Sequence, residues 1–425
     1  MLDIKFIREH PEIVKKDLRK RNDKEKLEWV DDLIKIDVEY RRLLQENQKL
    51  RQRRNEITDE INILRKQGKD FKEKIQEAKE LPDKIKKSDE KTEELKNKIH
   101  YYLMRLPNIL HESVPVGKDA NENVVVKTWG EKPKFNFELK PHGELLQDLG
   151  MANFEKAADV SGHGFYYLMG DAARLELALV HFATEFLAEK DFKLVEPPLM
   201  LRRGPYEGVT DLKDFETMMY KIENEDLFLI ATSEHPIAAL LMNETYDEKN
   251  LPLKIVGFSP CFRKELGSHS IDTRGIFRVH HFYKVEQFIF CKPEDSWKFH
   301  EELLKNAEEI YQKLEIPYRV VNICTGDIGI VAAKKYDIEA WFPRENLYRE
   351  VVSCSNCTSY QATRLNIKYR KGEEKEYLHT LNSTAVATSR TVRAIIENYQ
   401  QKDGSIKVPK VLQKYFGKKI IGKSR

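Results

Sequence analysis

Charged and aromatic residues alternate along two neighbouring segments in the middle of the sequence. The first segment reads Cys261-Phe262-Arg263-Lys264-Glu265, and the second runs from Arg278 to Glu286 as Arg-Val-His-His-Phe-Tyr-Lys-Val-Glu. Residues two apart on a β-strand share a face, so we expect Arg263 to point with Glu265. By the same rule, one face of the second strand would carry Arg278, His280, Phe282, Lys284 and Glu286.

These residue types suit a nucleotide and a small polar substrate. Guanidinium groups bind phosphate oxygens, and an aromatic ring offers a flat surface to a base. A carboxylate can hold an ammonium or hydroxyl group. The alternative is a solvated sheet surface with cross-strand ion pairs, which is common on exposed faces.

The surrounding segments predict a mainly antiparallel sheet flanked by helices. Short β-rich runs lie close together, which favours antiparallel pairing over a parallel βαβ array. The predicted strands are 192–196, 227–230, 253–258, 282–290 and 318–323, and the predicted helices are 172–189, 297–314 and 386–399. We therefore expect an α+β catalytic domain over residues 135–425, preceded by a linker at 111–134 that is rich in Pro, Gly and Asn.

Residues 1–110 predict a helical arm. Apolar residues recur every seven positions in two rows, which are Trp29, Ile36, Leu43, Leu50, Ile57 and Leu64, then Ala78, Ile85, Thr92, Ile99 and Leu106. This spacing keeps each row on one stripe of a helix. The turn around Gly68 joins the rows, so they predict an antiparallel coiled-coil hairpin over about residues 27–103. Pro82 predicts a kink or a helix start in the second helix.

The composition narrows the class of protein. Among 425 residues, 73 are Lys or Arg and 70 are Asp or Glu, so any nucleic-acid contact must rest on a local patch. The five scattered cysteines predict reduced thiols in a cytoplasmic protein. No apolar run approaches the ~18 residues of a membrane span. A P-loop or Rossmann site is disfavoured because no glycine-rich phosphate loop is present.

The two charged segments resemble motif 2 of class II aminoacyl-tRNA synthetases in its seryl form. The matching residues are Phe262 to Glu265, then Asp272-Thr273-Arg274-Gly275, then Arg278-Val279-His280-His281-Phe282. Other segments resemble motif 1 (Glu196-Pro197-Pro198-Leu199), the loop that binds the amino-acid ammonium group (Thr232-Ser233-Glu234), and the stretch ending in motif 3 (Glu350–Ser353, Ser355–Cys357, His379–Arg390 and Glu397–Gln400). The resemblance covers essentially the whole chain in the family's order. It implies a type-1 seryl-tRNA synthetase that works as a cytoplasmic homodimer without a membrane partner.

The resemblance also implies how ATP would bind. Arg263 would bridge the α-phosphate and the serine carboxylate, Arg390 would hold the γ-phosphate, and Phe282 would stack on adenine. The implied ATP-binding set is Arg263, Lys264, Glu265, Arg278, Val279, Phe282, Glu350, Val351, Val352, Ser353 and Arg390, of which Arg263, Glu265 and Arg390 would be catalytic. Glu350 and Ser353 would also bind Mg²⁺, which prefers oxygen ligands.

Serine and tRNA would meet other residues of the same resemblance. The implied serine-binding set is Thr232, Ser233, Glu234, Arg263, Glu286, Asn382 and Thr384, with Glu286 and Thr384 receiving the hydroxyl. A site built to hydrogen-bond a hydroxyl rejects alanine strongly. The arm would bind tRNA(Ser) phosphates through the basic cluster Lys49, Arg51, Arg53 and Arg54, although a charge run is often only a solvated face. Whether tRNA(Sec) is a second substrate stays open.

Two other functions stay open from the sequence. An amino acid:carrier-protein ligase would share the catalytic face but lack a long tRNA arm. A catalytically inactive synthetase paralogue would have lost Arg263, Glu286 or Arg390, and all three are present.

Some residues depart from simple patterns. Cys354 and Cys357 look like half a zinc site, but a structural site needs four ligands and only His379 is a further candidate nearby, so no zinc is expected.

Val352, Thr363 and Ser389 differ from the usual seryl pattern. None of the three differences removes a charged group that the resemblance assigns.

Overall fold

The computed structural model describes residues 1–212, 217–265 and 275–422. The chain divides into two compact units, Leu2–Pro107 and a larger unit of Met1 with Asn108–Arg425. Residues predicted as a linker belong to the larger unit, because strand β1 (Val124–Trp129) pairs with the edge of its main sheet. No helix in the described ranges is both long and apolar enough to cross a bilayer.

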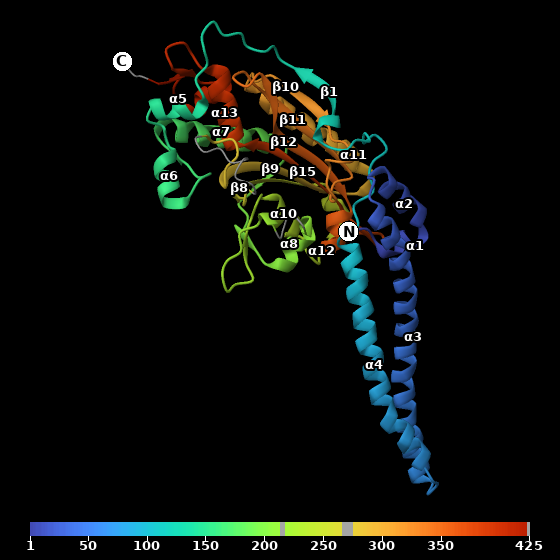
Figure 1. Cartoon of the computed structure of the whole chain (residues 1–425). Coiled ribbons are helices and arrows are strands. Elements are labelled where there is room, and N and C mark those ends of the chain that lie inside the picture. Colours follow the sequence, from blue (N-terminus) through green and yellow to red (C-terminus); the bar gives the residue numbers. More distant parts are fainter. Residues whose placement is uncertain (213–216, 266–274, 423–425) are drawn as a thin grey trace. The chain divides into compact units, whose positions relative to one another are not determined.

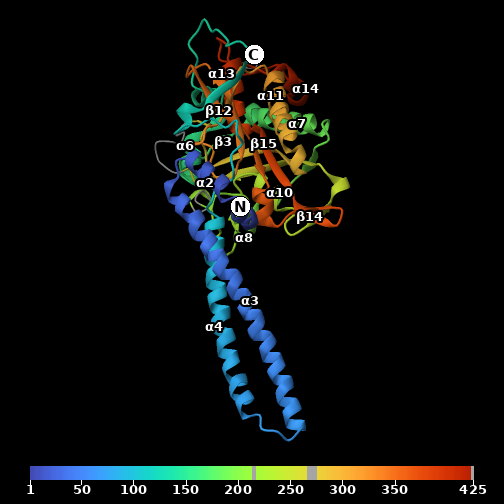
Figure 2. The same ribbon diagram turned by 90° about the vertical axis from the view of Figure 1, so that its right-hand side faces the viewer.

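The smaller unit is a helical hairpin on a short helical base. It contains α1 (Ile4–Glu9), α2 (Pro11–Lys20), α3 (Lys24–Lys66) and α4 (Lys72–Leu103). Figure 2 shows α3 and α4 side by side and joined by one turn. This confirms the predicted coiled-coil arm.

The seam of the hairpin mixes predicted and unpredicted contacts. Ile57 and Ile85 are buried, as the heptad rows predict. Asn47 is also buried in the seam, where its Nδ2 donates to Asp89 Oδ1 at 2.5 Å. Asp89 itself is exposed, so the bond joins a buried amide to an exposed carboxylate and favours the register in which these two residues face each other.

The prediction of a helix start at Pro82 is wrong, and the alternative prediction of a kink there stays a prediction. Helix α4 runs unbroken from Lys72 to Leu103 with Pro82 inside it. Pro82 is exposed, so its ring projects away from the seam and water can satisfy the carbonyl that loses its partner.

The larger unit is built on an eight-stranded sheet in the order β1-β10-β11-β12-β15-β9-β8-β4. Its other strands are β10 (Tyr318–Asn322), β11 (Lys334–Phe342), β12 (Leu347–Thr358), β15 (His379–Ala387), β9 (His281–Cys291), β8 (Leu253–Phe262) and β4 (Lys193–Val195). Every neighbouring pair is antiparallel except β4 with β8. The α+β class is therefore confirmed.

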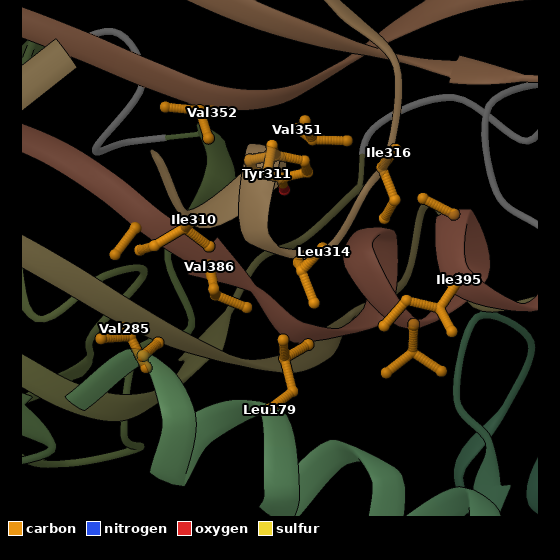
Figure 3. Packing of buried hydrophobic residues seen from close by; sticks show 14 of the residues in the cluster. Leu179, Val285, Ile310, Tyr311, Leu314, Ile316, Val351, Val352, Val386 and Ile395 are labelled. Atoms are coloured by element: carbon orange, nitrogen blue, oxygen red, sulfur yellow. The ribbon is translucent and has the colours of Figure 1, made fainter. Parts of the chain in front are cut away.

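Three helices cover one face of this sheet. They are α7 (Gly170–Ala188), α11 (Ser296–Lys313) and α13 (Thr388–Tyr399) (Figure 1). Figure 3 shows Leu179 of α7 and Ile395 of α13 in the same cluster as Val285 of β9 and Val386 of β15. This face is the main hydrophobic core. Helix α13 begins two residues later than predicted because Val386 and Ala387 pair in β15.

The opposite face of the sheet is covered only in part. Three short helices, α8 (Arg203–Val209), α10 (Glu234–Ala239) and α12 (Tyr360–Leu365), pack on Phe288 and Phe290 of β9. At the β10 end of this face, a small apolar cluster that includes Val321 and Ile323 also packs on the sheet. Between the two clusters the face carries polar side chains such as Glu286 and Ser353. This polar part of the face is where a ligand can enter.

Smaller elements complete the larger unit. They are η1 (Ala120–Glu122), α5 (His142–Asp148), β2 (Ala152–Asn153), α6 (Phe154–Ser161), β3 (Tyr167–Leu168), β5 (Met200–Leu201), β6 (Phe228–Leu229), β7 (Thr245–Asp247), η2 (Glu248–Asn250), η3 (Pro293–Asp295), β13 (Lys368–Lys371), β14 (Glu374–Tyr377), β16 (Ile406–Lys407), η4 (Lys410–Leu412), α14 (Gln413–Phe416) and β17 (Ile420–Ile421).

Candidate functional site

Neighbouring strands present rows of polar side chains to the partly covered face. Across β9 and β15, Glu286 pairs with Thr384. Across β12 and β11, Ser353 pairs with Asp337. Along β9 the same face carries Phe282, Lys284 and Glu286 at alternate positions, as the sequence predicts.

A β-bulge brings Glu350 and Ser353 to the same face of β12. Residues three apart on a regular strand point to opposite faces. Here Glu350 pairs with Glu339 and Val352 pairs with Ile338, so Val351 is an extra residue in the ladder. The bulge reverses the alternation once and turns both oxygen-bearing side chains into one cavity.

A second bulge acts in the same way on β15. Thr384 pairs with Glu286 and Val386 pairs with Val285, which leaves Ala385 as the extra residue. Thr384 and Ala387 consequently both line the cavity. The chain then enters α13, whose first turn carries Arg390 to the same place.

The polar face forms the floor of a cavity of about 300 Å³. Its charged lining consists of Arg263, Lys284, Lys335, Arg390, Glu234, Glu286 and Glu350. The uncharged lining consists of Thr210, Met218, Met219, Ala231, Thr232, His235, Phe282, Val351, Ser353, Asn382, Thr384 and Ala387. Charges that converge in a small cavity act on a ligand more strongly than they would in bulk water.

Three cations of the cavity are each engaged by a carboxylate. Lys284 Nζ lies 2.5 Å from Glu286 Oε2, Lys335 Nζ lies 3.3 Å from Asp337 Oδ2, and Arg390 Nη1 lies 3.4 Å from Glu350 Oε2. Burial opposes ionisation of Glu350, but Arg390 and then Lys335 lower its pKa below the usual range. These pairs hold the charges in fixed positions before a ligand arrives.

Arg263 differs from the other cations of the cavity. Within the described residues it has no carboxylate partner, and its Nε donates a long bond to Ala231 O at 3.4 Å. Its guanidinium carbon lies 5.3 Å from the centre of the Phe282 ring. Arg263 is therefore the cation most available to an incoming anion.

The carboxylate of Glu234 is buried near the other end of the cavity. Gln361 Nε2 and Asn382 Nδ2 donate to its Oε1 at 3.0 and 3.1 Å. Burial, together with the nearby Glu286 charge, raises the pKa of Glu234 to about 7. A ligand ammonium would compensate this buried charge.

Several residues that the resemblance assigns to ATP do not line this cavity, and their role stays a prediction. Strand β8 ends at Phe262, so Arg263 and Glu265 do not share a strand face. Lys264 N instead donates to Met218 O, and Glu265 Oε2 accepts from Arg278 Nε at 2.7 Å. Lys264, Glu265 and Arg278 do not line the cavity.

Strand β9 begins at His281, which places Arg278 and His280 before the strand rather than on its face. Val279 is buried in a small cluster with Phe282. The motif residues Asp272, Thr273 and Arg274 lie outside the described residues.

Two further predicted residues face inward. Ser233 is fully buried beneath β8, next to Gly257, and does not line the cavity. Val352 points to the main core, because the bulge at Val351 sends it to the opposite face from Glu350. Neither side chain reaches the cavity.

Sequence reasoning missed Lys335 and His235 and did not assign Lys284 to the site. The alternation along β9 could have indicated Lys284. Lys335 comes from a strand that the sequence analysis left unassigned. His235 follows the Thr232–Glu234 loop and is buried, which lowers its pKa to about 3 and keeps it neutral.

The basic cluster on the arm divides into two pairs. Arg51 Nη2 contacts Asp89 of α4 at 2.8 Å, and Arg53 Nε contacts Glu77 at 2.9 Å. Lys49 and Arg54 are exposed and make no ion pair with the part of the chain that the structure describes. Arg51 and Arg53 therefore also bind the two helices together.

Two family models match the sequence. One, described as the seryl-tRNA synthetase N-terminal domain, matches residues 1–110. The other, described as the tRNA synthetase class II core domain (G, H, P, S and T), matches residues 216–399. A serine–tRNA ligase of Methanocella arvoryzae is 60% identical over 419 residues, which span 98% of this chain and 99% of that protein. The chain belongs to the seryl-tRNA synthetase family.

Solved structures agree with this family over the full length. A crystal structure of seryl-tRNA synthetase from Pyrococcus horikoshii complexed with ATP is similar with a TM-score of 0.93 and 52% identity, and the match covers 100% of both chains. A cytoplasmic serine–tRNA ligase from Naegleria fowleri in complex with AMP is similar with a TM-score of 0.87 and 36% identity, covering 100% of this chain and 99% of that one. The family resemblance of the motifs is confirmed.

The close packing of α10 on β8 leads to a prediction about folding stability. A Cβ added at Gly257 would lie 2.5 Å from Ile237 Cδ1 and 2.6 Å from Ser233 Oγ, so α10 would have to move and carry Glu234 with it. Gly257→Ala should lower the free energy of unfolding by ~1–3 kcal/mol in denaturant titrations.

Gly204→Ala is the matched control, because a Cβ at Gly204 meets nothing within 4 Å. Its effect should stay within ~1 kcal/mol and favour the helix. Equal stability of the two variants would show that the contact of α10 with β8 is not tight.

Proposed function

We propose that this chain activates L-serine with ATP to seryl-adenylate and pyrophosphate, and then transfers serine to the 3′ end of tRNA(Ser) in the cytoplasm. The observation that carries this proposal is a cavity lined by Arg263, Phe282, Glu286 and Thr384, in which Arg263 has no carboxylate partner among the described residues. The curated relatives at 53–60% identity are serine–tRNA ligases. The solved relative from Pyrococcus horikoshii was crystallised with ATP.

Adenylation needs positioning and positive charge rather than a protein nucleophile. A carboxylate oxygen of serine attacks the α-phosphorus, the bond from that phosphorus to the bridging oxygen breaks, and pyrophosphate leaves with the electron pair. Arg263 would hold the carboxylate and the α-phosphate together, and Arg390 would hold the γ-phosphate. Phe282 would stack on adenine. A terminal ribose hydroxyl of tRNA then attacks the serine carbonyl, and AMP leaves.

The described geometry supports the serine contacts as a set. Glu234, with Thr232 beside it, would bind the substrate ammonium. Glu286 and Thr384 are adjacent across two strands and would receive the hydroxyl, with Asn382 near both substrate groups. Alanine would leave Glu286 buried without the substrate hydroxyl, which disfavours activation of alanine.

The oxygen atoms of Glu350 and Ser353 fit Mg²⁺. The bulge at Val351 turns both toward the cavity, and carboxylate and hydroxyl oxygens are ligands that Mg²⁺ accepts. Within the described ranges no group of three or more His, Cys, Asp or Glu side chains could hold a metal, so phosphate oxygens would have to complete the coordination. Bound there, Mg²⁺ would neutralise charge on the phosphates.

The arm, residues 1–110 with the hairpin over 27–103, would bind tRNA. Exposed Lys49 and Arg54 are available to phosphates, and Arg51 and Arg53 would add to the positive surface while holding α3 to α4. A ligase for carrier proteins would not need this hairpin. The arm therefore favours a tRNA substrate.

The first prediction from the proposed function separates amino-acid activation from tRNA charging. Arg263→Ala should abolish serine-dependent ATP–pyrophosphate exchange, because among the residues that the structure describes Arg263 is the one cation of the cavity without a carboxylate partner. Replacing residues 29–103 with a short Gly-Ser linker should spare exchange and abolish tRNA charging. The linker is feasible because the Trp29 ring centre lies 5.4 Å from that of Tyr102, so the ends to be joined are adjacent.

Arg370→Ala, at an exposed position on β13, should leave both reactions unchanged and serves as the control. Exchange without tRNA charging in the intact chain would favour the carrier-protein ligase. Charging that survived loss of the hairpin would overturn the proposed role of the arm.

The second prediction concerns pH. Burial raises the pKa of Glu234 to about 7, so its carboxylate becomes charged only as the pH rises through that value. The kcat/KM for serine, which reports the free enzyme, should rise between about pH 6 and pH 8. Glu234→Gln should lower kcat/KM and remove this rise. A profile in wild type that is flat over this range would contradict the proposed ammonium contact.

We also propose that two copies of the chain pair along motif 1. Strand β4 is an edge of the described sheet, and exposed apolar side chains lie on or near it at Leu177, Leu194, Leu199 and Met200. An exposed apolar patch at a sheet edge is typical of an interface. The exposed apolar side chains at this sheet edge therefore support a homodimer.

Light scattering after gel filtration tests the dimer. Wild type should have twice the mass of one chain, and Leu177→Glu combined with Leu194→Glu should have the mass of one chain. Leu240→Glu, at a similarly exposed residue directly after α10, should remain dimeric. A monomeric wild type, or a double variant that stays dimeric, would place the interface elsewhere or exclude it.

A further inference from the structure

Lys284 lines the cavity but has no role in the proposed reaction. It lies two residues before Glu286 on β9, and its Nζ contacts Glu286 Oε2 at 2.5 Å. The exposed fractions of the two side chains are only 7% and 2%. An exposed pair of this kind contributes little, but a desolvated pair depends strongly on both members.

The contacts of Glu286 are concentrated on one oxygen. Lys284 and the Thr384 hydroxyl, the latter at 3.4 Å, both engage Oε2. Among the residues that the structure describes, Oε1 has no hydrogen-bond partner. The carboxylate is thus anchored through one oxygen and offers the other.

We propose that Lys284 is a positioning residue that anchors Glu286 Oε2, so that Oε1 accepts the hydroxyl of the amino-acid substrate. This inference rests on the proposed function, in which Glu286 receives the serine hydroxyl. Lys284 acts through Glu286 and does not contact ATP. It thereby determines how strongly serine is preferred over alanine.

The charges around the pair support this role. Burial raises the pKa of Glu286, and Lys284 is the strongest influence against that rise, followed by Arg263. The Glu234 side chain is a second buried carboxyl group near Glu286, and the pKa of Glu234 is also raised. Without Lys284, the pKa of Glu286 would be higher still and Oε2 would lose its anchor.

The other cations of the cavity do not take this place. Arg390 is engaged with Glu350 and Lys335 with Asp337, so each has its own carboxylate. Arg263 makes no ion pair with Glu286 and is available to the ligand's anionic groups. Lys284 is therefore the cation that is tied to the hydroxyl acceptor.

A double-mutant cycle on the full chain tests the inference. Serine-dependent ATP–pyrophosphate exchange is measured for wild type, Lys284→Met, Lys284→Arg, Glu286→Gln and the double variant Lys284→Met/Glu286→Gln. Lys284→Met should lower kcat/KM for serine ~100-fold while the KM for ATP changes less than ~3-fold, because the loss acts through a buried hydrogen-bonded charge pair. Lys284→Arg should recover most of this loss.

The double variant decides whether Lys284 acts through Glu286. Its kcat/KM for serine should lie within ~3-fold of that of Glu286→Gln alone, since residues that act as a unit are not additive. The preference for serine over alanine should fall equally in Lys284→Met and Glu286→Gln. A loss in the double variant equal to the product of the single losses would overturn the inference. A rise in KM for ATP in Lys284→Met would do the same.

Folding is checked by thermal unfolding of each variant. If Lys284→Met alone does not fold, Lys284→Arg and the comparison of Glu286→Gln with the double variant, which has no charge at the pair, still decide the question. Wild type that does not exchange pyrophosphate with serine would remove the proposed function itself. Active wild type with an additive cycle would remove only the role of Lys284.

Discussion

The site depends on the register of four adjacent strands, because register decides which side chains face the cavity. A shift of one residue moves every side chain of a strand to the other face. On β12 and β15 the bulges at Val351 and Ala385 make such a shift locally, because each adds one residue to its strand. The apolar residues on either side of each bulge stay in the main core, while Glu350, Ser353 and Thr384 reach the cavity. Core packing and site geometry are thus set by the same backbone pairing.

Fixed charges give the cavity its chemistry. Three of its cations are held by carboxylates, and these pairs offset the repulsion among the cations and keep them in place. Arg263 remains without a carboxylate among the described residues, which makes it the natural point of contact for an anionic ligand. A reaction that builds negative charge at phosphorus is served by such a prearranged environment, because little reorganisation is needed when the charge develops. The cost is a set of buried carboxylates, and burial raises the pKa of Glu234 and of Glu286 accordingly.

Much of the architecture could be predicted from local patterns. The heptad rows predicted the hairpin, and alternation along β9 predicted the shared face of Phe282, Lys284 and Glu286, because both depend on backbone periodicity alone. The bulge at Val351 could not be predicted, since it depends on pairing with β11. The resemblance assigned Val352 to ATP together with Glu350, and the structure places its side chain in the core. The ion pair of Arg278 with Glu265 joins two segments, and such a pair leaves no mark on the sequence of either one.

The most direct measurement is a crystal structure of the full chain with serine and a non-hydrolysable ATP analogue. The bulged register predicts the α-phosphate within hydrogen-bond distance of the Arg263 guanidinium and the serine hydroxyl within hydrogen-bond distance of Glu286 and Thr384. It also predicts that Glu350 and Ser353 face the phosphates together. A nucleotide bound away from Arg263, or a regular β12 in which Glu350 and Ser353 point to opposite faces, would contradict this explanation of the site.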